Sequence, residues 1–84
     1  MKAIVTTFRG PTSTRGASIY ATAEGVPRLR LGYSYEGDAY EEHERAAHAL
    51  MKRLGWTGRI AGGSLPDGRS YAWVFVPSAR RRTR

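Results

Sequence analysis

The chain has 84 residues, a formal net charge of +7 and no cysteine. This length allows one domain with a single modest core. The lack of cysteine excludes disulfide scaffolds, thiol catalysis and cysteine-ligated zinc sites, and it suits a reducing compartment. The sequence has no signal-peptide pattern and no run of about 18 apolar residues, so we expect a soluble, cytoplasmic protein that does not contact membranes.

Three β-strands are predicted in the first 35 residues. Residues 2–8 are rich in β-branched side chains, residues 17–23 alternate in polarity, and the segment 9–16 between them contains glycine and proline and is predicted to be a loop. Residues 28–35 show the clearest alternation between apolar and polar side chains. One side of this segment is formed by Leu29, Leu31, Tyr33 and Tyr35. The three strands are expected to form an antiparallel meander with one face on the core.

One helix is predicted over residues 39–54. Asp38 is a favourable N-cap, and Gly55 suits the left-handed position that follows the end of a helix. An apolar stripe follows the three- and four-residue spacing of a helix. Its members are Tyr40, His43, Ala46, Ala47, Leu50, Met51 and Leu54.

The charged residues of this helix include two pairs that are predicted to lie on its outer side. Glu41 and Glu42 fall in the first turn, where the helix dipole favours negative charge. Glu41 with Arg45, and Glu44 with His48, are spaced four residues apart and are expected to form ion pairs.

Residues 58–77 are predicted to form a β-hairpin. Its turn is the segment 66–68, Pro-Asp-Gly, and its return strand is apolar on both faces, which favours a central place in a sheet. The predicted fold is therefore α+β: a single domain over residues 1–77, ordered β-β-β-α-β-β, with a mainly antiparallel five-stranded sheet and one helix packed on one face. The core and its rim are expected to include Phe8, Leu29, Leu31, Leu50, Leu54, Trp56, Trp73 and Phe75.

The sequence favours a protein without catalytic activity. The segment HERAAH at residues 43–48 differs from the zinc motif H-E-x-x-H, because histidines five residues apart lie about 140° apart on a helix, rather than about 40°. No nucleophile elbow, phosphate-binding loop, dinucleotide motif or calcium loop is present. We therefore expect no metal site, no cofactor and no enzymatic activity.

The polar side of the predicted sheet carries the residues best suited to binding. Alternation places Tyr20 on the second strand and both Arg28 and Arg30 on the third, with Arg15 at the entrance. Aromatic and arginine side chains on an open sheet face can stack on bases and pair with phosphates. The alternative interpretation is an ordinary solvated face.

The loop TSTRG, residues 12–16, is a second candidate site. Its hydroxyl groups, the guanidinium of Arg15 and the backbone N–H groups beside its glycine suit a phosphate or a carboxylate. An ordinary connection, whose threonine and serine side chains satisfy nearby backbone groups, is the favoured alternative because such loops are common.

The end of the chain carries more than half of the net charge. Residues 1–77 sum to +3 and residues 78–84 add +4, contributed by Arg80, Arg81, Arg82 and Arg84. Nothing in this Arg-rich tail is apolar enough to be held on a core, so we expect it to be disordered. Its arginines would contact phosphates without regard to sequence.

Several segments resemble one group of small uncharacterised bacterial proteins. These segments are TSTRGASIYA (12–21), EEHERAAHALMKRLGW (41–56), TGRIAGG (57–63) and YAWVFV (71–76). Members of the group have a T-x-T-R-G-x-x-I-x-A stretch before a helix that ends in L-G-W-x-G. The resemblance covers most of residues 4–76 and implies no activity, because the group has no established function.

Three functional hypotheses follow from the sequence. The first is a non-enzymatic accessory protein that binds nucleic acid through the sheet face and the Arg-rich tail. The second is a small protein–protein interaction domain that uses the sheet face without nucleic acid. The third, an enzyme, is the least favoured because no set of catalytic residues is present. The oligomeric state is left open, with a monomer favoured.

Overall fold

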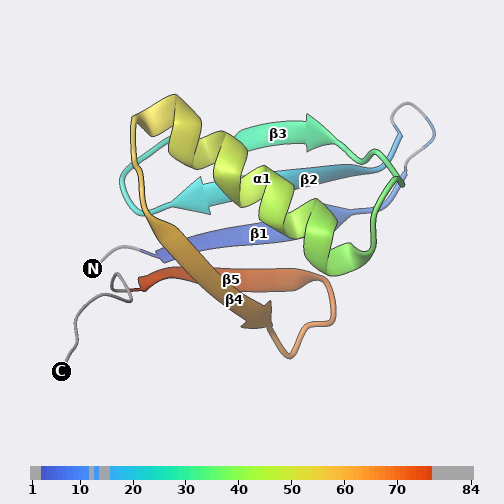
Figure 1. The fold of residues 1–84 in the computed structure, drawn as a ribbon. Helices are drawn as coiled ribbons and strands as arrows, with labels where there is room; N and C mark the ends of the chain where they lie inside the picture. The colour runs from blue at the N-terminus through green and yellow to red at the C-terminus, as the bar shows by residue number, and fades with distance from the viewer. Residues whose placement is uncertain (1–2, 12, 14–15, 77–84) are drawn as a thin grey trace, which may run out of the picture.

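Five antiparallel strands form one sheet, and one helix lies across one face of it (Figure 1). The computed structural model describes residues 3–11, 13 and 16–76. The elements are β1 (Ala3–Arg9), β2 (Ser18–Ala23), β3 (Leu29–Gly32), α1 (Ala39–Leu54), β4 (Arg59–Ser64) and β5 (Ser70–Val76). The predicted α+β fold and its order β-β-β-α-β-β are confirmed.

The strands lie in the order β3-β2-β1-β5-β4, which puts β1 at the centre of the sheet. β1 pairs with β2 on one side and with β5 on the other, and all pairs are antiparallel. The predicted meander β1–β2–β3 and the central place of β5 are confirmed. The turn between β4 and β5 uses Gly68, whose φ of +77° favours glycine, and whose N–H donates to the carbonyl of Leu65 at 3.1 Å.

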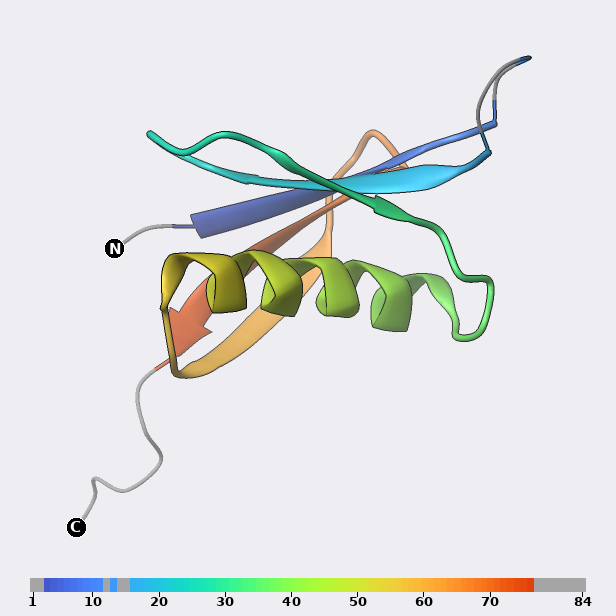
Figure 2. The same cartoon turned by 90° about the horizontal axis from the view of Figure 1, so that it is seen from above.

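The two faces of the sheet differ in what covers them. Figure 2 shows α1 on one side of the sheet. We call the side that faces α1 the inner face and the opposite side the outer face. No element of the described residues covers the outer face. Because side chains alternate along a strand, every second strand residue projects onto this open side.

The core lies between α1 and the inner face. Its largest fully buried side chains include Trp73, Ile4, Ile19 and Leu50. The other residues expected in the core or its rim are partly buried around this centre: Phe8, Leu29, Leu31, Leu54, Trp56 and Phe75. The indole of Trp73 also fills the space above Gly62 in β4, where an added Cβ atom would lie 2.5 Å from the ring.

The helix begins and ends where the local sequence predicts. The Asp38 side chain accepts a hydrogen bond from the N–H of Glu41 at 2.9 Å, and the Glu41 side chain accepts one from the N–H of Asp38 at 3.1 Å. These reciprocal bonds form a capping box. Gly55 has a φ of +75°, and its N–H donates to the carbonyl of Lys52 at 3.3 Å.

One predicted ion pair of α1 is wrong. Arg45 pairs with Glu42 at 3.0 Å rather than with Glu41, because the Glu41 carboxylate is held in the capping box. Glu42 lies in the first turn as predicted, and it is only 3% exposed. The pair of Glu44 with His48 is present, with 3.8 Å between its nitrogen and oxygen atoms.

The third strand is shorter than its alternating pattern predicts. β3 ends at Gly32, whose carbonyl accepts a hydrogen bond from Arg45 Nη2 at 3.0 Å. Beyond it, the N–H and hydroxyl of Ser34 donate to the carboxylate of Glu42, which draws the chain towards α1. Tyr35, expected on the core side, is 69% exposed with a φ of 62°. Its placement on the inner face was therefore wrong.

Two predicted features lie outside the described residues. One is most of the TSTRG loop, at residues 12, 14 and 15, and the other is the Arg-rich tail at residues 78–84. In the part of the chain that the structure describes, no helix has the length and apolar character needed to cross a membrane.

Candidate functional site

Arginine and tyrosine side chains meet on the outer face, where β1, β2 and β3 lie side by side. The strand register places Tyr20 between Thr7 of β1 and Arg30 of β3, so these three residues form one row across the sheet. Arg9, which pairs with Ser18, and Arg28, just before β3, lie diagonally on either side of Tyr20. The local fold thus gathers three arginines around one aromatic ring.

The ring of Tyr20 contacts two of these guanidinium groups. Arg28 Cζ lies 4.5 Å from the ring centroid and Arg9 Cζ lies 5.6 Å from it. Both distances fall within the range of cation–π attraction, which contributes about 0.5–1 kcal/mol at an exposed site. The ring therefore orients the arginines, and is less available for stacking on a base than the sequence suggested. We call Arg9, Arg28 and Arg30 the arginine cluster.

The arginine cluster has no acidic neighbour among the described residues. All three arginines are exposed, and no described carboxylate lies within 4.0 Å of any of them. None of the strands β1 to β5 contains an acidic residue. The acidic residues lie in turns and around the first half of α1: Glu24, Glu36, Asp38, Glu41, Glu42, Glu44 and Asp67. The outer face is thus cationic, while the helix side carries most of the negative charge.

A small apolar patch adjoins the arginine cluster on the outer face. It consists of Ala3, Val5, Ala61, Ala72 and Val74, which the register of β1, β5 and β4 brings together. Val74 is the most notable member, because 43% of its surface is exposed. No described element covers this patch.

The predicted sheet-face residues are partly brought together. Tyr20, Arg28 and Arg30 lie side by side as expected. Arg15 and the tail arginines Arg80, Arg81, Arg82 and Arg84 lie outside the described residues. Arg9 was missed because the first strand was predicted to end at residue 8. Arg9 lies two residues beyond Thr7, so alternation would have placed it on the outer face if the strand had been extended by one residue.

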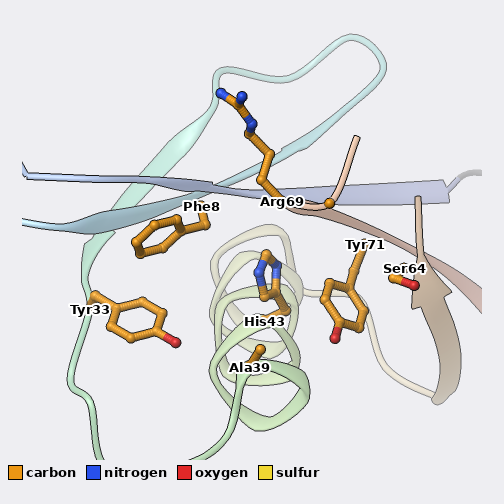
Figure 3. Close-up of a pocket in the computed structure, with 8 residues that line it drawn as sticks. Phe8, Tyr33, Ala39, His43, Ser64, Arg69 and Tyr71 are labelled. Atoms are coloured by element: carbon orange, nitrogen blue, oxygen red, sulfur yellow. The ribbon is translucent and has the colours of Figure 1, made fainter. Parts of the chain in front are cut away.

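A second feature is a cleft of about 210 Å³ on the inner side, beside the first turn of α1 (Figure 3). The side chains that define it are Phe8, Tyr33, Ala39, His43, Ser64 and Tyr71. Phe8 and Tyr33 meet edge to face with ring centroids 5.0 Å apart, and the rings of His43 and Tyr71 lie 4.4 Å apart. The cleft is therefore lined mainly by flat rings.

His43 connects this cleft to the core. It is 2% exposed and lies on the apolar stripe of α1, as predicted. Its Nδ1 atom lies 2.7 Å from Thr6 Oγ1, and this hydroxyl oxygen accepts a hydrogen bond from Trp73 Nε1 at 3.0 Å. Burial lowers the pKa of His43, and the Thr6 backbone, Asp67 and Glu42 oppose this only in part. The imidazole is thus neutral at neutral pH.

Neither feature suits a metal ion. Among the described residues no group of three histidine, cysteine, aspartate or glutamate side chains could hold one. Comparisons of the chain with protein-family models, with curated proteins and with solved structures gave no match. The arginine cluster and the cleft therefore supply the observations on which a function is inferred.

Proposed function

We propose that this chain binds nucleic acid, without catalysing a reaction, through the outer face of its sheet. The observation that carries the proposal is the arginine cluster: three exposed arginines around Tyr20, on a face whose strands contain no acidic residue. Guanidinium groups donate paired hydrogen bonds to phosphate oxygens, and this geometry suits a backbone of closely spaced phosphates.

The separation of charge supports a polyanion as the ligand. The acidic residues of segment 36–44 lie on the helix side, so a nucleic acid that approaches the outer face meets positive charge and avoids negative charge. Arginines that already pair with carboxylates would have to break those pairs before they bound phosphate. The arginine cluster has no such described pair to break.

The contribution of Tyr20 is to hold the guanidinium groups in place. An exposed arginine loses side-chain freedom when it binds, which opposes binding. Contact with the Tyr20 ring restrains Arg28 and Arg9 before the ligand arrives, so less freedom is lost. Phosphate contacts of this kind fix position and carry no sequence information, so we propose sequence-independent binding.

Replacing Arg28 and Arg30 together with alanine is expected to weaken binding to oligonucleotides. If each arginine contacts one phosphate, the slope of log K against log[salt] should flatten by up to about 1.8 units on duplex DNA and about 1.4 units on a single strand. Fluorescence anisotropy at several low salt concentrations measures both the affinity and the slope.

The matched control removes two positive charges from the other side of the molecule. Lys52 and Arg53 are exposed at the end of α1, and their double alanine variant should change the slope much less. Tyr20→Phe, which keeps the aromatic ring, should retain affinity. Equal losses in the two double variants would contradict a site on the outer face.

Deleting the Arg-rich tail, residues 78–84, tests how much the positive charge of the tail contributes to binding. The tail carries four arginines and can neutralise up to four phosphates, so its removal should flatten the salt slope on duplex DNA by up to about 3.6 units. We expect the melting temperature to stay nearly unchanged. Residual binding that is then lost in the Arg28 and Arg30 double variant would locate a site on the sheet, whereas binding by the tail alone would oppose one.

A second candidate function is protein–protein interaction through the same face. The apolar patch favours it, because Val74 exposes an aliphatic side chain beside the arginine cluster on a surface that no described element covers. A pull-down from host lysate with and without nuclease separates the two functions. A partner retained after nuclease treatment, together with no oligonucleotide binding at low salt, would favour the protein partner.

A further inference from the structure

The lining of the cleft beside α1 suits a flat ring. It opens where the first turn of α1 meets the end of β1 and the start of β5 (Figure 3). Phe8 and Tyr33 come from one side and Tyr71 from the other, with the imidazole of His43 between them. Base stacking on aromatic side chains is the usual way in which proteins hold flat heteroaromatic rings.

His43 offers a polar atom to whatever occupies the cleft. The indole N–H of Trp73 can only donate, so Thr6 Oγ1 accepts from it and can give its own proton to Nδ1 of the neutral imidazole. The ring proton then resides on Nε2, to which no side chain of the described residues is hydrogen-bonded, while the Thr6 backbone lies near the imidazole. Buried polar groups are nearly always hydrogen-bonded, so an occupant that accepts a hydrogen bond from the imidazole is favoured over one that only donates. Ser64 also lines the cleft.

The charges around the cleft disfavour an anionic occupant. Burial, and next the carboxylate of Glu42, raise the pKa of Tyr33, and Asp38 adds to the same effect. Asp67 lies close enough to His43 to oppose the lowering of its pKa. The N-terminus of α1 already has the side chains of Asp38 and Glu41 as its partners. An uncharged ring with hydrogen-bond acceptors fits these surroundings.

Arg69 links the cleft to the outer face. Its carbonyl accepts a hydrogen bond from the N–H of Phe8 at 2.9 Å, which places it at the end of β1. Arg69 is among the residues that line the cleft, and Figure 3 shows its side chain on the side of the sheet away from the helix. A ligand with a ring in the cleft and a phosphate beyond the end of β1 would meet the guanidinium of Arg69. One nucleotide carries its base and its phosphate in this arrangement, joined through the sugar.

We propose that the cleft receives one base of a single strand whose phosphates lie against the arginine cluster and Arg69. This inference rests on the proposed function, and it adds that the bound nucleic acid is single-stranded and is held by a base as well as by its backbone. A base paired within a duplex could not enter the cleft. The base is recognised as an uncharged flat ring that accepts a hydrogen bond.

The test compares a short oligothymidylate with an abasic oligomer of the same length and backbone. The base-bearing strand should bind the full chain roughly 5- to 100-fold more tightly, as expected for the stacking of one base. Ala39→Leu, at an exposed position in the first turn of α1, should fill the cleft and remove this difference without weakening the abasic oligomer. Ala49→Leu, on the same helix outside the cleft lining, is the control and should change neither affinity. NMR signals of the His43 ring should shift when thymidine is added.

The outcomes distinguish the cleft from the outer face. Equal affinities for the two oligomers, with His43 signals unmoved by thymidine, would overturn the cleft proposal while the outer face could still bind phosphates. A preference for the base-bearing strand that survives Ala39→Leu would also overturn it. If thymidine moves the His43 signals but neither oligomer binds, the cleft stands as a base site and the proposed function fails.

Discussion

Replacing Leu50 with alanine is expected to lower the free energy of unfolding by about 2–5 kcal/mol. Leu50 is 0% exposed and lies in the second half of α1, within the core cluster between the helix and the sheet. Removing its terminal carbons leaves a cavity that the surrounding residues fill only in part. A domain of this size has about 5–15 kcal/mol of total stability, so the loss is a large fraction of it. Chemical denaturation followed by circular dichroism measures the change.

The control for this prediction is His48→Ala, two positions earlier on the same helix. The His48 side chain is exposed and pairs with Glu44 at 3.8 Å, and exposed pairs contribute about 0.2–1 kcal/mol. The substitution should therefore change stability little. A substantial loss at His48 together with a small loss at Leu50 would show that α1 presents a different face to the sheet.

Local signals were enough to predict most of the fold. The bounds of α1 were found because Asp38 and Gly55 act within one turn of the helix ends, through contacts between near neighbours in sequence. The turn before β5 was found in the same way, since proline and glycine restrict or permit backbone angles by themselves. The central place of β5 followed from its composition.

The errors arose where distant residues decide the outcome. Nothing near Glu42 in the sequence shows that its carboxylate will meet Ser34, and without that contact the alternation of segment 28–35 predicts a longer strand. The same applies to the candidate sites. Tyr20 and Arg30 could be placed together by alternation, whereas the cleft joins residues from β1, α1 and β5 and is visible only in the folded chain.

The buried carboxylate of Glu42 holds the segment after β3 against α1. It accepts hydrogen bonds from the N–H of Ser34 at 3.2 Å, from the hydroxyl of Ser34, from the N–H of Gly37 at 3.3 Å, and from Arg45 Nη2 at 3.0 Å. Arg45 in turn donates to the carbonyl of Gly32 at the edge of the sheet. A buried charge with this many donors is stable only while it remains ionised.

Acid is therefore expected to destabilise the protein through Glu42. The hydrogen bond from Ser34, and then that from Arg45, lower the pKa of Glu42 from 4.5 to about 2, against the opposing effect of burial. Because the folded-state pKa is the lower one, the stabilisation is complete above about pH 5 and is lost as the pH falls towards 2. The shift corresponds to about 3 kcal/mol.

Glu42→Gln should remove most of this stabilisation at neutral pH and flatten the dependence of unfolding free energy on pH between about 5 and 2. The amide cannot carry the charge that faces Arg45, and its NH₂ group meets donors where the carboxylate accepted. Urea denaturation at a series of pH values measures both effects.

Glu36→Gln is the matched control, because Glu36 is exposed and the structure gives its carboxylate no partner among the described residues. Asp67, whose pKa is also lowered, is present in both variants and titrates equally in each. A Glu42→Gln protein with the stability and the acid response of the Glu36→Gln control would show that the Glu42 network does not hold the end of β3 against α1.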